Sequence, residues 1–217
     1  MVSDADRDAE AVIAELLRAE RPDDGLVGEE GSRSPAAGAR RWVVDPLDGT
    51  TNFLYGNPAW SVSVALEDED GGLAGVVHDP ARGETFRAAR GGGCELNGRP
   101  VRVREHDRIE TALLASGFGY EAELRARQAD TLRHVLPRVR DVRRAGSAAL
   151  DLAWVAAGRL DGYWERGLKP WDWAAGTLLV SEAGGAVESL PGEPAGLAAA
   201  SPELIRSLVA LVTERAT

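Results

Sequence analysis

The first residues of the chain place apolar side chains at helical spacing. Ser3 or Asp4 is suited to cap a helix, and Pro22 is expected to follow its last turn. The apolar positions of this predicted helix are Ala9, Val12, Ile13, Leu16 and Leu17. Their spacing predicts one apolar face that packs on the rest of the protein.

Short apolar runs separated by turn residues follow this helix. Strands are predicted at residues 26–27, 41–45, 60–66, 73–78 and 84–89. In residues 60–66, Trp60, Val62, Val64 and Leu66 alternate with smaller residues, which is the period of a half-buried strand. Asn97-Gly98, between residues 94–96 and 101–103, predicts a tight hairpin. The first half is therefore expected to be rich in β-structure and largely antiparallel.

The second half alternates between the two periodicities. Strands are predicted at residues 112–116, 139–143, 160–164 and 197–200, and helices at residues 120–136, 147–157, 171–183 and 202–212. Helices interleaved with strands predict a layered α/β fold. The sequence shows no internal repeat and no long linker, so residues 1–217 are interpreted as a single domain.

Composition and charge narrow the class of protein. The 217 residues are 44% hydrophobic and 28% charged, as in ordinary globular proteins. The net charge of the chain is −10. Binding to the phosphates of nucleic acid requires a basic surface, so no nucleic-acid partner is expected. Cys94 is the single cysteine, and the opening residues do not resemble a signal peptide. No apolar stretch approaches the roughly 20 residues of a membrane span, so a cytoplasmic location without membrane contact is expected.

Several common catalytic groups are missing from the sequence. The three histidines are scattered without metal-ligand spacing, and one cysteine cannot form a cysteine-rich zinc site. There is no phosphate-binding Gly-rich loop ending in Lys-Ser/Thr, and no serine stands in a Gly-x-Ser-x-Gly turn. The remaining candidates for chemistry are carboxylates.

Asp45 and Asp48 flank a proline turn at the end of a predicted strand. Two acids this close repel each other, and a hard cation such as Mg²⁺ would neutralise them. Residues 49–53 then supply a glycine turn, hydroxyls and backbone N–H groups suited to phosphate. The same residues also fit an ordinary tight loop. Glu29-Glu30 equally fits a solvated surface, and Asp172 equally fits the start of a helix.

Three segments together resemble the inositol monophosphatase family of metal-dependent, lithium-sensitive sugar phosphatases. They are W-V-V-D-P-L-D-G-T-T-N-F at residues 42–53, G-E-E at residues 28–30, and E-R-G-L-K-P-W-D-W-A-A-G with S-E-A-G-G within residues 165–185. The resemblance covers essentially the whole chain. It implies a layered αβαβα sandwich, and a homodimer. Family members usually begin with a further helix and loop ahead of the residues that match Val2 onward, so that helix is expected to be lacking here.

The resemblance also implies roles for individual residues. The implied ligands of two or three Mg²⁺ ions are Glu29, Asp45, the Leu47 carbonyl, Asp48 and Asp172. The implied phosphate-binding residues are Gly49 and Thr50, and the implied catalytic residues are Glu29, Asp45 and Thr50, with Glu29 and Thr50 orienting the attacking water. The implied substrate-binding residues are Asp48, Gly146, Ser147, Ala148, Glu165 and Asp172. Gly146-Ser147 also fits a helix cap, and Glu165 could instead pair with Arg166.

The expected reaction is hydrolysis of a phosphomonoester by in-line attack of a metal-activated water. Residues 51–53 and Glu165 favour inositol-1-phosphate among small phosphorylated alcohols. Histidinol phosphate is the main alternative, followed by fructose 1,6-bisphosphate and 3′-phosphonucleotides. A different class of function, a non-catalytic regulatory family member, is disfavoured by the intact set of acids.

Overall fold

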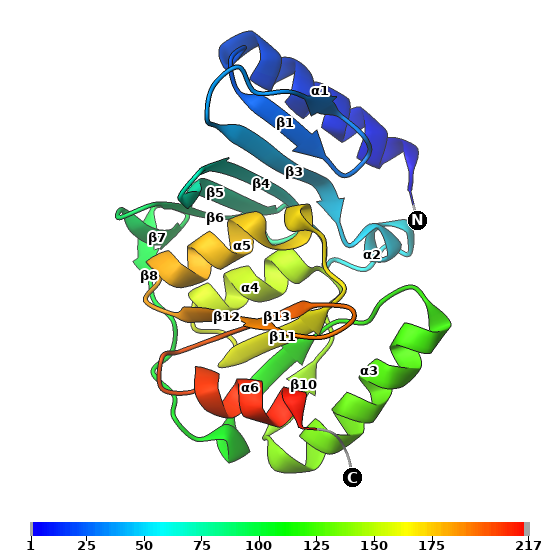
Figure 1. Cartoon of the computed structure of the whole chain (residues 1–217), viewed down its shortest axis with the longest axis vertical. Helices are drawn as coiled ribbons and strands as arrows, with labels where there is room; N and C mark the ends of the chain where they lie inside the picture. The colour runs from blue at the N-terminus through cyan, green and yellow to red at the C-terminus, as the bar shows by residue number, and fades with distance from the viewer. Residues whose placement is uncertain (1, 215–217) are drawn as a thin grey trace.

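The computed structural model describes residues 2–214, which form five layers of alternating helices and sheets (Figure 1). One helix covers the outer face of a large sheet, two helices separate this sheet from a smaller one, and two more cover the far face of the smaller sheet. In that order the helices are α1 (Asp4–Glu20), α4 (Ala148–Ala156) with α5 (Pro170–Glu182), and α3 (Ala122–Val135) with α6 (Ile205–Thr213). The predicted αβαβα sandwich is confirmed.

The large sheet has eight strands in the order β2-β1-β3-β4-β5-β6-β7-β8. Its strands are β1 (Gly25–Gly28), β2 (Arg33–Ser34), β3 (Arg41–Asp48), β4 (Ser61–Asp68), β5 (Gly71–Asp79), β6 (Glu84–Ala89), β7 (Gly93–Leu96) and β8 (Arg99–Val101). All neighbours are antiparallel except β1 and β3, as expected of a largely antiparallel first half. Asn97 and Gly98 both have positive φ in the two-residue turn between β7 and β8, which confirms the predicted hairpin.

The smaller sheet has five strands in the order β10-β9-β11-β13-β12. Its strands are β9 (Leu113–Ser116), β10 (Asp141–Arg143), β11 (Gly162–Arg166), β12 (Ala186–Leu190) and β13 (Gly196–Ala200). Strand β9 pairs in parallel with both β10 and β11, and the remaining pairs are antiparallel. Short helical segments complete the chain at α2 (Thr50–Leu54), η1 (Ile109–Thr111) and η2 (Leu136–Arg138).

The main hydrophobic core lies between the two sheets, around α4 and α5. Leu150 and Leu152 of α4 and Leu179 of α5 are fully buried there, together with Phe86 of β6. Complete burial of one such side chain stabilises the fold by about 1.5 to 3 kcal/mol. Helix α4 is apolar almost all round because it is covered on both sides by sheets. A second core lies between the smaller sheet and α6.

Helix α1 packs on the large sheet through a face that its apolar pattern did not predict. Its fully buried positions are Asp6, Glu10 and Ala14. Val12 and Leu16 are 67% and 61% exposed, so their predicted burial was wrong, whereas Ile13 and Leu17 are half-buried against the sheet. Two acids lie on the buried face because Asp6 accepts a hydrogen bond from Thr50 at the start of α2 and Glu10 accepts two from the loop between β1 and β2. Apolar periodicity cannot reveal such partners.

Strand β4 has the predicted alternation, but its smaller residues face the crowded side. Ser61, Ser63 and Ala65 are almost completely buried. Val62, Val64 and Leu66 are only half-buried. Helix α5 approaches this part of the sheet closely, since a Cβ at Gly75 of the neighbouring strand would lie 3.1 Å from the Ala175 backbone. Small side chains permit that approach.

Three elements differ from the sequence predictions in extent. Strand β3 continues past Asp45 to Asp48, with a register shift against β4 where the proline turn was expected. Strands β2 and β12 were not predicted, because neither has a strong alternation of apolar and polar residues. Each pairs with a single neighbouring strand. Both are edge strands of their sheets.

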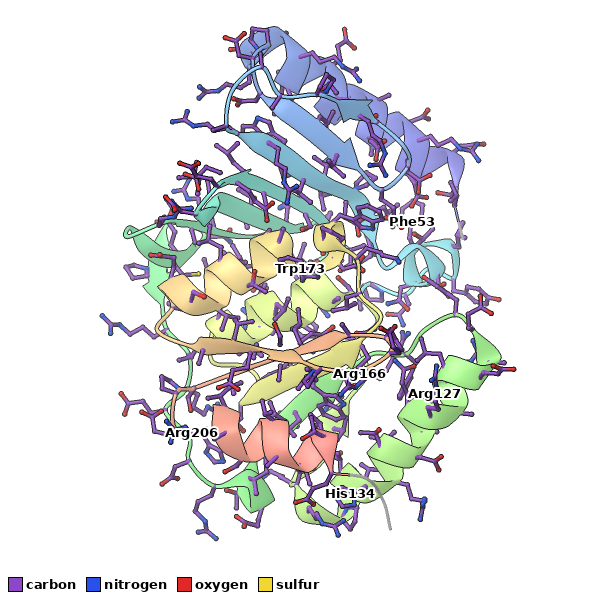
Figure 2. The ribbon with its side chains drawn as sticks, in the orientation of Figure 1. Phe53, Arg127, His134, Arg166, Trp173 and Arg206 are labelled. Carbon is purple, nitrogen blue, oxygen red and sulfur yellow. The ribbon has the colours of Figure 1, made fainter. Side chains whose placement is uncertain are left out.

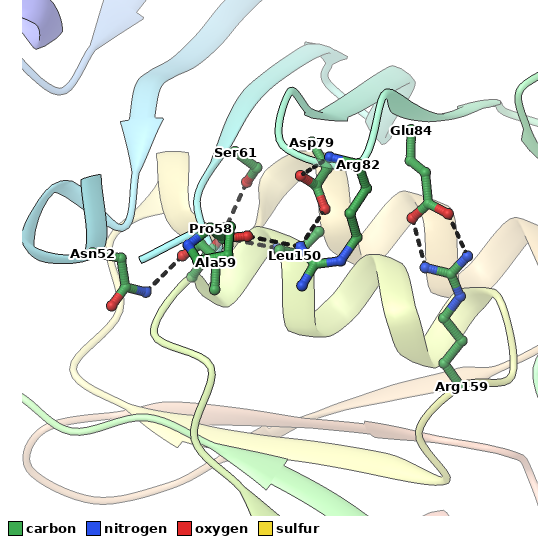
Figure 3. Close-up of polar contacts among 10 residues, drawn as sticks. Asn52, Pro58, Ala59, Ser61, Asp79, Arg82, Glu84, Leu150 and Arg159 are labelled. Atoms are coloured by element: carbon green, nitrogen blue, oxygen red, sulfur yellow. Dashed lines mark hydrogen bonds and ion pairs between the residues drawn. The ribbon is translucent and has the colours of Figure 1, made fainter. Parts of the chain in front are cut away.

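Polar contacts fasten the layers and loops together. Arg159, which follows α4, donates two hydrogen bonds of 2.6 Å to Glu84 of β6, and Arg82 bridges Asp79 and the Pro58 carbonyl at 2.8 Å each (Figure 3). Within residues 2–214, no helix has the length and apolar character needed to cross a membrane.

The loop between β12 and β13 is held by two arginines (Figure 2). Arg127 of α3 donates to the Glu193 carbonyl, and Arg166 at the end of β11 donates to the carbonyls of Pro191 and Pro194. The Arg166 guanidinium is therefore engaged by backbone oxygens, and no ion pair joins it to Glu165 among the described residues. The ion pair between Glu165 and Arg166 that the sequence left open is therefore not formed.

Candidate active site

Three carboxylates from distant parts of the chain meet between the large sheet and helix α5. Asp45 and Asp48 come from the end of β3, and Asp172 comes from the first turn of α5. One carboxylate oxygen from each lies within 4.8 Å of one from each of the others. Asp45 and Asp48 are buried, and Asp172 is partly exposed. This arrangement could hold a metal ion.

The carboxylates cannot all be charged without compensation. Two unit charges about 4.8 Å apart repel by about 3 to 4 kcal/mol at an effective dielectric constant of about 20. Burial, with the charge of Asp48 next in importance, raises the pKa of Asp45 well above its usual value. Burial and the charge of Asp172 raise the pKa of Asp48 to about 8, and burial raises the pKa of Asp172 to about 6. Carboxylate oxygens in such a cluster are the donor set that a hard divalent cation prefers.

Backbone and hydroxyl donors fix the orientation of Asp48. The Ser147 hydroxyl and the Ala149 N–H each donate to the same Asp48 oxygen at 2.7 Å. Both donors belong to the start of α4, where Ser147 is also the N-cap and accepts a hydrogen bond from the Leu150 N–H. Among the described residues, no hydrogen-bond donor contacts the second oxygen of Asp48. Helix α4 therefore holds one member of the cluster from the opposite side of the core.

The other two acids are held by local backbone. Asp45 accepts a hydrogen bond of 2.9 Å from the Leu47 N–H, which closes the irregular end of β3. Asp172 accepts one of 2.6 Å from the Lys169 N–H, as part of the cap of α5. Asp172 therefore both caps α5 and belongs to the acidic cluster. One carboxylate can do both because its two oxygens have several lone pairs.

Glu29 lies beside this cluster but outside the group of three. Glu29 is exposed as a whole, but the protein atoms packed around its carboxyl exclude water and raise its pKa to about 7, with a hydrogen bond to Asp45 opposing that rise. The loop that carries Glu29 is held by a buried acid on α1, because Glu10 accepts hydrogen bonds from the N–H groups of Glu30 and Ser32 at 2.8 and 2.7 Å. A Cβ at Gly28 would lie 2.3 Å from a Glu10 oxygen, so a glycine is needed for this approach.

Thr50 connects the cluster to α1. Its hydroxyl lies 2.9 Å from an Asp6 oxygen and 3.2 Å from the Leu47 carbonyl, and both Thr50 and Asp6 are buried. Gly49 precedes Thr50 as the N-cap of α2 with φ of 98°. A Cβ there would lie 3.0 Å from the Ala59 carbonyl, so both backbone conformation and space call for glycine.

The remaining predicted residues lie at the start of α4 and the end of β11. Gly146 has φ of 103°, and the Ser147 hydroxyl is used by Asp48 as described. Gly146-Ser147 thus forms the helix cap that the sequence left open, and Ala148 begins the helix. Glu165 lies near enough to Asp48 for its charge to help raise the Asp48 pKa. The acids predicted from the sequence therefore lie close together in the structure, around the cluster of Asp45, Asp48 and Asp172.

Sequence reasoning missed two residues of this place, Asp6 and Glu10. Both lie on the buried face of α1. Asp6 is joined to the site by its hydrogen bond with Thr50, and Glu10 by its hydrogen bonds with the loop that carries Glu29. A signal existed in the sequence: two acids spaced four apart, followed four positions later by Ala14, define one helical stripe. Acids in the first turns of a helix are common for capping alone, which hid this signal.

A comparison with known proteins agrees with this geometry. The sequence profile of the inositol monophosphatase family matches residues 1–215. The chain therefore belongs to the inositol monophosphatase family, which is a family of phosphoric monoester hydrolases.

Individual relatives carry two kinds of name. An inositol-1-monophosphatase of Rhizobium meliloti is 50% identical over 186 residues, which cover 85% of this chain and 70% of that protein. A Nus factor SuhB of Pseudomonas aeruginosa is 46% identical, over 88% of this chain and 73% of that protein. Among solved structures, the extragenic suppressor protein suhB of Bartonella henselae superposes with a TM-score of 0.92 at 40% identity, covering 98% of this chain and 84% of that one.

Proposed function

We propose that this protein is a Mg²⁺-dependent phosphomonoesterase whose substrate is inositol-1-phosphate. The observation that carries the proposal is the cluster of Asp45, Asp48 and Asp172, whose ligand atoms lie within 4.8 Å of one another, with two of the three residues buried and the third partly exposed. The family and the relatives named inositol-1-monophosphatase support the choice of substrate. Residues 1–217 act in this proposal as one catalytic domain.

The chain's own residues divide into ligands and supports. Asp45, Asp48, Asp172, Glu29 and the Leu47 carbonyl would hold the cations. Mg²⁺ bound there supplies positive charge that neutralises a phosphate and lowers the pKa of a water. The ligands fit this task because their oxygens are hard donors and their mutual repulsion is relieved by a cation. Ser147 and Ala149 keep Asp48 directed at the cluster.

Thr50 orients the attacking water in this proposal. Its proton points to Asp6 or the Leu47 carbonyl, so the lone pairs of its oxygen can accept a hydrogen bond from a water on the other side. Asp6 thereby fixes the direction of the Thr50 hydroxyl. Glu29 is the second acceptor for that water. The chain offers no histidine at this place among the described residues, so the acids and Thr50 carry the proton relay.

The substrate's alcohol is expected to lie between the start of α4 and Glu165. The Gly49-Thr50 turn would bind the phosphate, and residues 146–148 with Glu165 would line the space for the ring. Carboxylates of Glu165, Asp48 and Asp172 can accept hydrogen bonds from several hydroxyls of a polyol. A polyol phosphate satisfies this acid-rich surface with donors, which favours inositol-1-phosphate.

The test is phosphate release from inositol-1-phosphate and from histidinol phosphate, with Mg²⁺ or with EDTA. We expect Mg²⁺-dependent turnover that is greatest with inositol-1-phosphate and is lost in Asp45→Asn. Asp130→Asn is the matched control, because Asp130 is 72% exposed on α3. Turnover that persists in EDTA, or that survives Asp45→Asn, would contradict the metal mechanism. A preference for histidinol phosphate would mean that histidinol phosphate, and not inositol-1-phosphate, is the substrate.

A non-catalytic regulatory role is a second candidate, favoured by the relatives named Nus factor SuhB. In that case the carboxylate cluster would still bind Mg²⁺, but no phosphate would be released from any of the candidate substrates. The same assay separates the two functions, provided that thermal unfolding confirms Mg²⁺ binding. Size-exclusion chromatography with light scattering tests the expected homodimer.

A further inference from the structure

Tyr163 and Glu165 lie two positions apart on β11 and therefore face the same side of the smaller sheet. That side is the one packed against α4 and α5, since Tyr163 belongs to the core between the two sheets. Trp164 and Arg166 point to the opposite side, toward α6 and the loop after β12. That side of β11 faces α4 and α5, whose first residues include Ser147 as the cap of α4 and Asp172 in α5 (Figure 1).

Tyr163 is fully buried and has one polar group to satisfy. Its hydroxyl donates a hydrogen bond of 2.6 Å to Oε2 of Glu165. Among residues 2–214 it is the one donor to the Glu165 carboxyl. Burial places this hydrogen bond in a medium of low dielectric, where a bond to a charged acceptor is stronger than at the surface. Tyr163 therefore restrains the rotamer of Glu165.

Gly117 lies directly against the Glu165 carboxyl. A Cβ at Gly117 would overlap Oε2 and the carboxyl carbon, so the carboxyl occupies the space that a side chain at position 117 would fill. The Tyr163 hydroxyl and the Gly117 backbone both adjoin Oε2, which leaves this end of the carboxyl little room to move.

The surroundings of Glu165 disfavour its ionised form. Burial raises the pKa of Glu165 to about 7, and the charge of Asp172 adds to that rise. The hydrogen bond from Tyr163 opposes the rise, and so does the charge of Arg144. Asp151 of α4 is buried nearby, and its Oδ1 has no hydrogen-bond partner in the described part of the chain. Tyr163 thus supplies the hydrogen bond that favours a carboxylate able to accept from substrate hydroxyls.

We propose that Tyr163 is a positioning residue that holds Glu165 in place to bind the hydroxyl groups of a polyol phosphate. The pair would then set the preference for substrates with hydroxyls near the phosphate, without taking part in metal binding or in bond cleavage. This inference rests on the proposed function, and specifically on Glu165 as a substrate contact.

The experiment compares Tyr163→Phe with the wild-type chain on two substrates. Inositol-1-phosphate offers hydroxyls to Glu165, whereas p-nitrophenyl phosphate offers none. We expect the KM for inositol-1-phosphate to rise about tenfold with kcat changed less than about threefold, as for loss of one hydrogen bond to a charged group. Both constants for p-nitrophenyl phosphate, and the rise in Tm produced by Mg²⁺, are expected to stay within error. Tyr55→Phe is the matched control, because Tyr55 is 82% exposed.

Two further variants keep the test decisive. In Glu165→Gln, the added change Tyr163→Phe should have little further effect on KM, because both act through one contact. Gly117→Ala should displace the Glu165 carboxyl from its place beside the Tyr163 hydroxyl and raise the same KM, so it separates the pair while leaving Tyr163 intact if Tyr163→Phe fails to fold.

The outcomes separate the inference from the proposed function. Equal losses on both substrates, or an unchanged KM for inositol-1-phosphate, would overturn the role of Tyr163 while the phosphatase function stands. Effects of Tyr163→Phe and Glu165→Gln that simply add would overturn it as well. A wild-type chain that releases phosphate from neither substrate would overturn the proposed function, and this inference with it.

Discussion

The Thr50 hydroxyl and the Asp6 carboxylate are joined by a buried hydrogen bond of 2.9 Å that spans 44 positions of sequence. Asp6 belongs to the first turn of α1, and Thr50 begins α2 beside the acidic cluster. Helix α1, on the outer face of the large sheet, therefore contacts the site through Asp6. Glu10, one turn later, reaches it again through the loop of Glu29.

Asp6→Asn is expected to lower kcat by about 100-fold, the scale of losing one positioned group in proton transfer. The amide can turn its NH₂ toward Thr50, which would redirect the Thr50 proton toward the place of the water. Phosphate release from inositol-1-phosphate measures the loss. Ser3→Ala is the control, because the Ser3 hydroxyl caps α1 by accepting from the Asp6 N–H, and its contact with the Asp6 carboxylate is to the oxygen that Thr50 does not use. It should cost about 1 kcal/mol of stability and leave kcat nearly unchanged. Equal kcat losses in both variants would indicate that α1 matters only as a whole.

Glu10→Gln is expected to weaken Mg²⁺ binding about tenfold, as for other residues that hold a metal ligand in place. One of the two oxygens that accept from Glu30 and Ser32 becomes an NH₂ group, so the loop of Glu29 loses a contact. Tm measured across a Mg²⁺ titration reports the affinity without any need for turnover. Glu15→Gln, at an exposed position of the same helix, is the control. An unchanged titration curve in Glu10→Gln would refute this role.

Ser147→Ala is expected to destabilise the protein by about 1 to 3 kcal/mol and to weaken Mg²⁺ binding. The change removes a donor to Asp48 and the cap of α4 together. Ser147→Thr keeps the hydroxyl and should restore both properties. Urea unfolding with and without Mg²⁺ measures them. A Ser147→Ala variant with normal Mg²⁺ affinity would show that the Ala149 N–H alone suffices to orient Asp48.

Without a divalent cation, stability is expected to fall as pH rises from about 5 to 8. The pKa values are raised to about 6 for Asp172, about 7 for Glu29 and about 8 for Asp48, mainly by burial. Across this range the folded protein binds more protons than the unfolded chain, so the free energy of unfolding decreases with pH. The contribution is fully present below the usual carboxyl pKa and is lost as pH passes the raised values.

Mg²⁺ should oppose that loss, because it stabilises the ionised acids. Tm in EDTA and in Mg²⁺, measured at intervals from pH 5 to 8, tests the prediction. We expect the two curves to diverge with rising pH, and Asp45→Asn to flatten the EDTA curve by removing one repulsive charge. A Tm in EDTA that rises toward pH 8 would contradict the account of repulsion within the cluster.

Much of the architecture follows from local patterns. Strand alternation, the Asn97-Gly98 turn and the helices of the second half each appear in the structure close to where the sequence predicts them. These signals are local, because they depend on side-chain period and on backbone conformations that particular residues favour. Strands β2 and β12 escaped prediction because edge pairing, and not their own composition, makes them strands.

The sequence by itself determined which residue types are available for chemistry: closely spaced acids, a glycine turn with hydroxyls, and no credible nucleophile. Only the tertiary structure decided which of these residues meet. Asp172 joins Asp45 and Asp48 across more than 120 positions of chain, and Ser147 donates the hydrogen bond that helps to hold Asp48. Asp6 and Glu10 were hidden because their hydrogen-bond partners lie in other layers of the fold. A buried polar side chain is specified by what it meets, and that information is spread over distant segments that only folding brings together.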